Sequence, residues 1–358
     1  MDRAIMWIMA AGALIGGADR IFGNRLGLGK KFEEGFLLMG STALSMAGII
    51  CLVPLLSKLL RVLGALLLKP LGVDPAMLAG ILAIDMGGYQ LAVELAADPL
   101  AGRFSGIVVG AILGCTATFT IPLGMGLLDA DSRPDFARGI LFGLISMPIA
   151  LVLGALTCGL SLGTALWQSL PVLLVSLLLL LGIWKRTDAM IRSFSVFATG
   201  IRILATLGLM LGAVTYMTGL ELIPGLAPLA EAMEVVVAIA VVMLGSLPVS
   251  ELLQRALKRP LAWMQRATGM NSASAAGLLI GMVSVLPAIA LVKDMDRRGR
   301  IVNAAFMVCA ASCFAAHLGF TVGVDAPMLP ALLVSKLAGG AIGAGLALFA
   351  TRRKQQHA

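Results

Sequence analysis

Apolar runs of about 20 residues recur along almost the whole chain, and they limit its fold more than any other feature. They lie at residues 4–22, 35–56, 104–128, 137–160, 196–219, 300–322 and 329–350. A helix of about 20 residues spans the hydrocarbon core of a bilayer. The chain is 59% hydrophobic and 13% charged, whereas soluble domains have about 25% charged residues. We therefore predict an all-α polytopic membrane protein with about eleven hydrophobic segments.

The polar connections between these runs exclude several other classes of protein. The longest, at 129–138 and 293–300, are too short to hold an ATPase domain. The five cysteines lie within or beside apolar segments, which argues against a disulfide framework. The net charge is +8, but the basic residues stand in short loops, where they set membrane topology. We predict no nucleic-acid partner, no cofactor and no metal site.

One apolar run is interrupted in its middle. In GILAIDMGGYQLAVELAAD, residues 80–98, Asp85, Gly87 and Gly88 stand where a membrane helix would have apolar side chains. Adjacent glycines weaken a helix and allow the chain to turn. This segment is therefore predicted to be broken.

A similar segment occurs later in the chain. KPLGVDPAMLAGILAIDMGG at 69–88 matches ATGMNSASAAGLLIGMVSVLP at 267–287 with a constant separation of 197 positions, as between Gly80 and Gly277. Ser284 and the proline that follows in VSVLP interrupt the second apolar run at the corresponding place. Paired interruptions in two halves of a chain indicate the binding site of a transporter.

The basic residues favour re-entrant hairpins at both interruptions. If 75–97 and 273–293 each enter and leave the membrane on one face, 20 of the 27 Lys and Arg residues fall on the inner side and 5 on the outer side. If every segment crosses, the two sides hold 12 and 13. We predict two five-segment inverted repeats, each with a broken or re-entrant hairpin, and a cytoplasmic C-terminus. The first repeat covers 1–165, a linking span 166–190 and the second repeat 191–358.

Asp85 is the leading candidate for a binding residue. A carboxylate in the middle of a membrane costs about 3 kcal/mol, so it is rare without a function or a partner. Tyr89 lies one helical turn later, and a break at Gly87 and Gly88 would expose backbone carbonyl groups nearby. A carboxylate, an aromatic face and free carbonyls together suit a small cation. The alternative is a structural Asp85 that caps the break or pairs with Arg202.

Three other polar residues in apolar runs are candidates for contact with the substrate. Thr118 and Ser284 offer hydroxyl groups. His317 follows Cys309 and Cys313 at four-residue steps, which predicts that the three share one helical face. No fourth ligand is evident, so we favour a polar contact or a proton-linked switch over a metal site. A structural hydrogen bond is the alternative for the histidine.

Three glutamates near the ends of apolar runs are candidates for attracting or gating a cation. Glu33 and Glu34 come just before a predicted span and follow two lysines. Glu94 stands near the far end of the first hairpin. The alternative for all three is an ordinary solvated position at the membrane surface.

Several longer sequence segments of the chain resemble one known family. FEEGFLLMGSTALSMAG, AIDMGGYQLAVELA, RGRIVNAAF, GLELIPGLAP and HLGF resemble the EutH family, the membrane transport component of ethanolamine-utilisation systems, in matching order over almost the whole length. The resemblance implies a carrier for ethanolamine in the bacterial cytoplasmic (inner) membrane and not an enzyme. The chain departs from the family pattern at Ala316, where an acidic residue is expected, and at VSVLP, where paired asparagines are expected.

Together these observations predict transport of ethanolamine as ethanolammonium for ethanolamine catabolism. The amine is protonated below about pH 10, so most of it cannot cross lipid unaided. Asp85 would supply the anion, Tyr89 an aromatic wall, and Ser284, Thr118 or His317 a partner for the hydroxyl group. The alternatives are a permease for another small organic cation or amino alcohol and, more remotely, an intramembrane enzyme. The sequence leaves open a homodimer and any coupling to protons or sodium.

Overall fold

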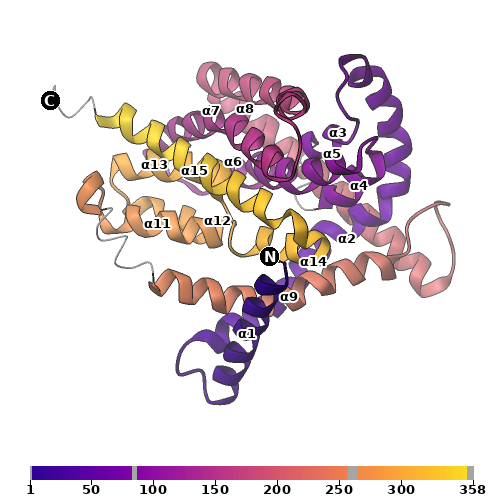
Figure 1. Cartoon of the computed structure of the whole chain (residues 1–358), viewed down its shortest axis with the longest axis horizontal. Helices are drawn as coiled ribbons and strands as arrows, with labels where there is room; N and C mark the ends of the chain where they lie inside the picture. Colours follow the sequence, from indigo (N-terminus) through magenta and orange to yellow (C-terminus); the bar gives the residue numbers. More distant parts are fainter. Residues whose placement is uncertain (1, 83–86, 257–264, 353–358) are drawn as a thin grey trace. The chain divides into compact units, whose positions relative to one another are not determined.

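The structure is a computed structural model that describes residues 2–82, 87–256 and 265–352. Within these ranges the regular secondary structure is helical, as Figure 1 shows. The predicted all-α class is therefore confirmed for the described part of the chain. The sequence reason is the length and uniform hydropathy of the apolar runs, which allow every backbone group to bond within its own segment.

The described chain divides into two compact units. Unit 1 comprises Met1–Gly110, Thr199–Leu253 and Phe314–Leu329, and unit 2 comprises Ala111–Ala198, Gln254–Cys313 and Pro330–Ala358. Each unit takes segments from both halves of the sequence. The predicted boundaries 1–165, 166–190 and 191–358 concern sequence repeats and not compact units, and they stay a prediction.

The helices that lie wholly or mainly in unit 1 are α1 (Asp2–Ile21), α2 (Leu28–Leu67), η1 (Lys69–Leu71), α3 (Met77–Ile81), α4 (Gly88–Leu95), α5 (Pro99–Arg103), α9 (Leu229–Ala256), α14 (Ala316–Asp325) and η6 (Ala326–Met328). The helices of unit 2 are η4 (Thr116–Thr120), α6 (Ile121–Leu127), α7 (Arg133–Thr157), α11 (Ser272–Val283), α12 (Val285–Ala290), η5 (Val292–Asp294), α13 (Arg297–Ala310) and α15 (Leu329–Arg352). Among the described helices, α9 and α15 cross the boundary between the units by three residues or fewer, whereas the π-helix η3 (Phe104–Gly114) and α8 (Leu162–Thr218) have longer parts in both units.

Seven helices among the described residues are long and apolar enough to cross a membrane. They are Leu28–Leu67, Pro99–Leu127, Arg133–Thr157, Leu162–Arg186, Asp188–Thr218, Leu229–Leu253 and Ala316–Thr351. The predicted count of about eleven segments is not confirmed. The two interrupted segments contribute only short helices, and the apolar run 300–322 is divided by a turn at 311–315.

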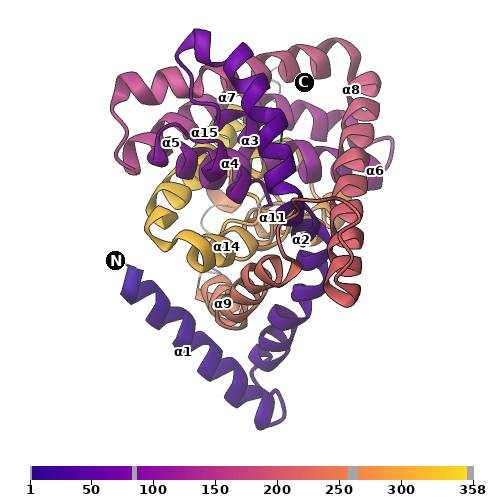
Figure 2. The ribbon, with the colours of Figure 1, turned by 90° about the vertical axis from the view of Figure 1, so that its right-hand side faces the viewer.

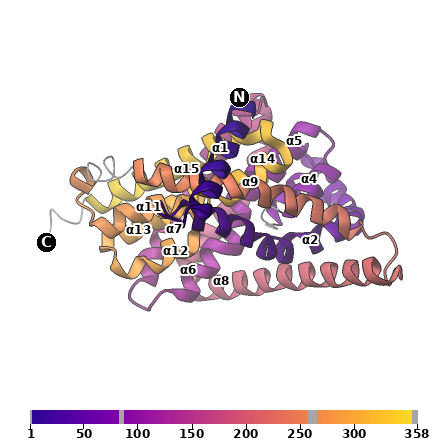
Figure 3. The same cartoon turned by 90° about the horizontal axis from the view of Figure 1, so that it is seen from below.

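Helix α8 contains two of these candidate spans. Arg186 has non-helical dihedral angles, φ −145° and ψ 61°, and divides the helix into Leu162–Arg186 and Asp188–Thr218. The second part is drawn along the lower edge of Figure 3. Only 12% of its most apolar window is buried within the protein. Such a surface is costly in water and favourable against hydrocarbon.

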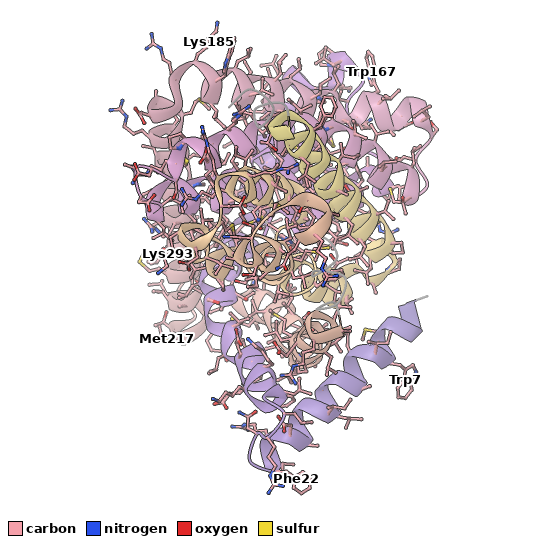
Figure 4. The ribbon with its side chains drawn as sticks, turned by 90° about the vertical axis from the view of Figure 1, so that its left-hand side faces the viewer. Trp7, Phe22, Trp167, Lys185, Met217 and Lys293 are labelled. Atoms are coloured by element: carbon pink, nitrogen blue, oxygen red, sulfur yellow. The ribbon has the colours of Figure 1, made fainter. Side chains whose placement is uncertain are left out.

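Large apolar side chains on α1 also face outward. Trp7 is 74% exposed, and Phe22, just beyond the end of the helix, is 71% exposed. Both point away from the ribbon in Figure 4. Together with the seven apolar helices, this exposure fits a multi-pass membrane protein.

A buried carboxylate fixes the turn between α1 and α2, which Figure 2 shows. Gly27 precedes the first residue of α2 with a positive φ of 73° and provides no side-chain cap. Asp19 of α1 provides the cap instead, because its carboxylate accepts the backbone N–H groups of Leu28 at 2.8 Å and Gly29 at 2.9 Å. The first turn of α2 is thus satisfied by the preceding helix.

Candidate functional site

Residues 74–98 of unit 1 form a hairpin whose two ends are joined. The carboxylate of Asp74 accepts the backbone N–H groups of Ala97 at 3.1 Å and Asp98 at 2.8 Å. A continuous helix would separate residues 74 and 98 by about 36 Å. The chain therefore reverses between these ends. Residues 83–86 lie outside the described residues.

The two arms of this hairpin, α3 and α4, pack against each other. Ala76 and Ala79, at the start of the first arm, lie in one apolar cluster with Leu91, Ala92 and Leu95 of the second. Small side chains on one arm let the larger leucines of the other approach closely. Whether the hairpin enters a bilayer from one face stays a prediction.

Unit 2 contains a second hairpin with a similar closure. Helices α11 and α12 are separated by Ser284, which is extended with φ −151° and ψ 133°. At the open end, Asn271 donates its backbone N–H to Asp296 Oδ1 at 2.9 Å and its side-chain amide to the carbonyl oxygen of Asp294 at 2.8 Å. Ser274 Oγ donates to the same carboxylate at 2.6 Å. Figure 1 shows α11 and α12 in succession, and α11 packs against α13.

The residue that leaves each hairpin is an aspartate that caps the next helix. Asp98 accepts the N–H of Leu100 at 3.0 Å and begins α5, and Asp296 accepts the N–H of Gly299 at 3.2 Å and begins α13. Burial opposes the ionisation of Asp296, but hydrogen bonds from the Ser274 hydroxyl and from backbone N–H groups outweigh it and hold its pKa below the usual value. At neutral pH this cap is therefore a charged one.

The helix after each hairpin is also tied to the hairpin's first arm in the same manner. Ser105 Oγ donates to the carbonyl oxygen of Ala76 at 2.7 Å, and Asn303 Nδ2 donates to that of Ser274 at 2.8 Å. Both donors and both acceptors are 198 positions apart, one more than the separation of the sequence match. These equivalent bonds, each within its own unit, support a repeat. Its inverted orientation stays a prediction.

Tyr89 is part of a polar group in unit 1 that includes a buried ion pair. Its hydroxyl donates to Asp325 Oδ2 at 3.2 Å, and Arg103 binds the same carboxylate with two hydrogen bonds, Nε to Oδ2 at 2.7 Å and Nη2 to Oδ1 at 2.6 Å. The side chain of Asp325 is only 7% exposed and that of Arg103 is 34% exposed. The ring of Phe320 meets the Tyr89 ring edge-on, with centroids 6.0 Å apart.

The local backbone explains how these side chains come together. Gly106 of η3 lies directly against Tyr89, where a Cβ atom would come within 2.9 Å of the tyrosine Cα. Asp325 ends α14 with non-helical angles, φ −157° and ψ 66°, and a 3-10 turn with Pro327 follows. The Asp325 carboxylate, at the end of α14, thus meets the hydroxyl of a tyrosine whose backbone is held against η3.

This arrangement is suited to binding a cation. It combines a buried carboxylate, two aromatic rings and a phenol hydroxyl, which are groups that bind alkylammonium ions. Arg103 already neutralises Asp325 in this state. A bound cation would therefore share the carboxylate with the guanidinium group or displace it.

Comparison with known proteins identifies the family. The model of the family described as ethanolamine utilisation protein, EutH, matches residues 1–350. The chain belongs to the EutH family. This confirms the family that the sequence segments predicted.

Relatives of this EutH-family chain cover it almost completely. A Listeria monocytogenes protein named probable ethanolamine permease EutH is 40% identical over 354 residues, 99% of this chain and 95% of the relative. An Escherichia coli protein of the same name is 34% identical over 387 residues, 97% and 95% of the two chains. A Bacillus subtilis protein, the uncharacterized protein YxeR, is 38% identical over 352 residues, 98% and 95% of the two chains. No solved structure matches the chain.

The predicted binding residues of this EutH-family chain fall in different places. Gly87 and Gly88 form the start of α4, directly before Tyr89. Asp85 lies outside the described residues. His317 is buried on α14, the helix that carries Phe320 and Asp325. Thr118 and Ser284 belong to unit 2, where the Thr118 hydroxyl donates to the carbonyl oxygen of Gly114 at 2.7 Å.

The prediction that Cys309, Cys313 and His317 share one helical face is wrong. Helix α13 ends at Ala310, and α14 begins only at Ala316. Between them Ser312 has a positive φ of 55° and donates its N–H to the carbonyl oxygen of Gly281 at 2.9 Å. Hydrogen bonding to α11 thus replaces the helix at this point.

The three predicted gating glutamates all form ion pairs with basic residues near them: Glu33 with Arg20 at 3.5 Å, Glu34 with Lys31 at 2.7 Å and Glu94 with Arg61 at 2.9 Å. All six side chains are at least about one-third exposed. This geometry favours the alternative of solvated surface positions. A gating function for them stays a prediction.

The sequence analysis missed Arg103, Phe320 and Asp325. Asp325 stands between the apolar runs 300–322 and 329–350, and Arg103 directly precedes the run 104–128. Opposite charges next to the ends of apolar runs were the signal that could have suggested their pairing.

Proposed function

We propose that the protein carries ethanolamine, as ethanolammonium, across the bacterial cytoplasmic membrane for ethanolamine catabolism. The observation that carries this proposal is membership of the EutH family over residues 1–350. Relatives in Listeria monocytogenes and Escherichia coli are named probable ethanolamine permeases. Ethanolamine is mostly cationic below about pH 10, so it needs a protein route through lipid.

The groups of unit 1 support a cation route. Asp325 offers a buried carboxylate, and Tyr89 and Phe320 offer aromatic rings beside it. In the proposed route Asp85 also contacts the ammonium group, and Gly87 and Gly88 allow the chain to turn there. This assignment gives the substrate an anion and an aromatic wall without requiring any bond to be made or broken.

Further parts of the proposal concern the hydroxyl group and the membrane. Thr118, Ser284 or His317 supplies a hydrogen-bond partner for the substrate hydroxyl. The protein is a multi-pass transporter and not an enzyme, its C-terminus is cytoplasmic, and its two hairpins enter the membrane from opposite faces. A homodimer is compatible with this arrangement. The second candidate is transport of another small organic cation or amino alcohol, because one relative has no assigned substrate.

The decisive experiment is counterflow of labelled ethanolamine in proteoliposomes that contain the purified protein. We expect exchange with internal ethanolamine that protein-free liposomes lack. Proton and sodium gradients imposed separately will show whether either drives accumulation. Competition with methylammonium and with longer amino alcohols separates the two candidates. Absence of exchange with ethanolamine, together with exchange of a competitor, would reject the proposed substrate.

The Asp85→Asn variant is expected to lower ethanolamine uptake at least about tenfold, because loss of an ion pair to an ammonium group in a dry site removes more than 1.4 kcal/mol of binding energy. Uptake is measured at neutral and at mildly acidic pH. Asp131→Asn, in the exposed loop after α6, is the matched control and should transport normally. Unchanged uptake by Asp85→Asn at both pH values would remove Asp85 from the site while leaving the transport proposal in place.

A further inference from the structure

A second charged group is buried in unit 2. Lys336 of α15 is fully buried, at 0% exposure, and its Nζ donates to the carbonyl oxygen of Ala111 at 2.8 Å. Lysine is almost never fully buried unless it is paired. An ionisable residue within a membrane helix is costly and commonly marks a functional site.

The ammonium group of Lys336 donates to a backbone carbonyl oxygen and does not pair with a carboxylate of the described residues. No ion pair among the described residues includes Lys336. The Ala111 carbonyl that accepts its proton belongs to the π-helix η3. Irregular helices of this kind are frequent at functional sites.

The end of helix α13 also lies close to Lys336. Cys309 is in its last turn, and Cys313 is in the turn that follows. Gly339, three positions after Lys336, is packed so tightly that a Cβ atom would come within 2.8 Å of Cys309 Sγ. The carbonyl end of a helix carries partial negative charge and favours a cation. The π-helix η3 thus supplies a backbone oxygen to the buried ammonium group, and the carbonyl end of α13 packs against the turn of α15 that follows Lys336.

The part of Lys336 that occupies this position has the form of a small alkylammonium ion. Its atoms from Cγ to Nζ correspond to propylammonium, which ethanolammonium matches in length with a hydroxyl in place of the methyl group. We propose that unit 2 contains a binding site for a primary alkylammonium ion and that Lys336 fills it with its own side chain. The protein thereby carries a covalently attached cation and needs no second, coupling cation at this site.

This site belongs to unit 2, whereas the Asp325 group belongs to unit 1, and its main test does not depend on what the protein transports. In the Lys336→Ala variant, purified in detergent, the thermal unfolding midpoint is measured with and without propylammonium. We expect a saturable increase of roughly 5 °C at concentrations far above the dissociation constant. Wild-type protein, whose own lysine occupies the site, is the reference: an increase in Lys336→Ala beyond that of wild type measures binding in unit 2 and not at the Asp325 group of unit 1.

Two additives serve as matched controls. The neutral isostere 1-propanol tests whether filling the cavity is enough, and tetramethylammonium tests whether any cation is enough. An equal increase with 1-propanol, or no increase with propylammonium, would overturn the proposal. Sodium chloride at the same ionic strength separates a site for alkali ions from one for alkylammonium ions, and a sodium effect equal to that of propylammonium would contradict the proposed ligand class.

The Lys336→Met variant keeps the test valid if Lys336→Ala does not fold. Methionine retains most of the side-chain length but leaves the Ala111 carbonyl without an ammonium donor. We expect Lys336→Met to take up ethanolamine at least about tenfold more slowly than wild type measured alongside. Lys336→Arg should retain part of the wild-type uptake. Wild-type uptake by the Met variant would overturn the proposal. Recovery of ethanolamine uptake in the double variant Lys336→Met/Asp85→Asn would also overturn the proposal, because Lys336 would then act as the counter-ion of Asp85.

Discussion

Replacing Asp325 by asparagine is expected to lower the free energy of unfolding by about 2 to 3 kcal/mol and ethanolamine uptake at least about tenfold. The buried carboxylate accepts two hydrogen bonds from Arg103 and one from Tyr89. Asparagine removes the negative charge while the guanidinium group stays partly buried. Because Arg103 is 34% exposed, the loss should stay below that of a fully buried pair. Unfolding in detergent and uptake by proteoliposomes measure the two effects.

The ion pair between Arg61 and Glu94 is a matched control for stability in the same unit. It has a similar N–O distance, 2.9 Å, but both side chains are about half exposed. Glu94→Gln should therefore change the free energy of unfolding by at most about 1 kcal/mol. If Asp325→Asn lowers the free energy of unfolding no more than Glu94→Gln does, burial does not strengthen the ion pair of Asp325.

The double variant Arg103→Gln/Asp325→Asn separates a structural role from a role in transport. Removing both charges leaves no uncompensated guanidinium group, so part of the lost stability should return. Uptake should remain low if the carboxylate is on the cation route. Recovery of uptake together with stability would show that Asp325 only compensates Arg103, and it would exclude the carboxylate from the proposed site.

The helical class could be predicted because its signal is local. Each apolar run has the length and composition of a membrane helix, and no distant residue is needed to recognise it. The first interruption was predicted for the same reason, since Gly87 and Gly88 follow one another in an apolar run. The structure describes a hairpin there, closed by Asp74. The role of Asp74 was not predicted, because its partners are more than 20 residues away.

The turn at 311–315 was missed because nothing in its sequence breaks a helix. Its residues are Ala, Ser, Cys, Phe and Ala, without glycine or proline. The helix gives way to bonds with other segments: Ser312 donates to the Gly281 carbonyl oxygen within unit 2, and Ser250 donates to that of Phe314 within unit 1. Tertiary hydrogen bonds of this kind override local helix propensity.

The polar group around Tyr89 was only half predicted for a related reason. Tyr89 was chosen because it follows Asp85 by one turn, which is a local relation. Arg103 and Asp325 are 222 positions apart, and their pairing depends on how α14 packs. A charge in a membrane helix can be recognised from sequence, but its partner is fixed by packing of distant helices.

Replacing Asp74 by alanine is expected to lower the free energy of unfolding by about 3 kcal/mol, because the buried carboxylate is the acceptor for three backbone N–H groups. These belong to Ala76 at 2.9 Å, Ala97 at 3.1 Å and Asp98 at 2.8 Å. Asp74→Asn keeps one acceptor oxygen and should lose less. Unfolding in detergent measures the loss, and hydrogen exchange of the α4 amides measures opening of the hairpin.

The exchange data decide what the Asp74 carboxylate does for the hairpin. If it holds the two ends together, amides of α4 should exchange faster in Asp74→Ala than in wild type, while those of α7 in unit 2 stay protected. The exposed Asp131→Ala should change neither stability nor exchange. Equal exchange of α4 in all three proteins would mean that the apolar contacts of Ala76 and Ala79 with α4 suffice to close the hairpin. Closure of the hairpin would then depend on packing alone, and not on the charge that precedes the first arm.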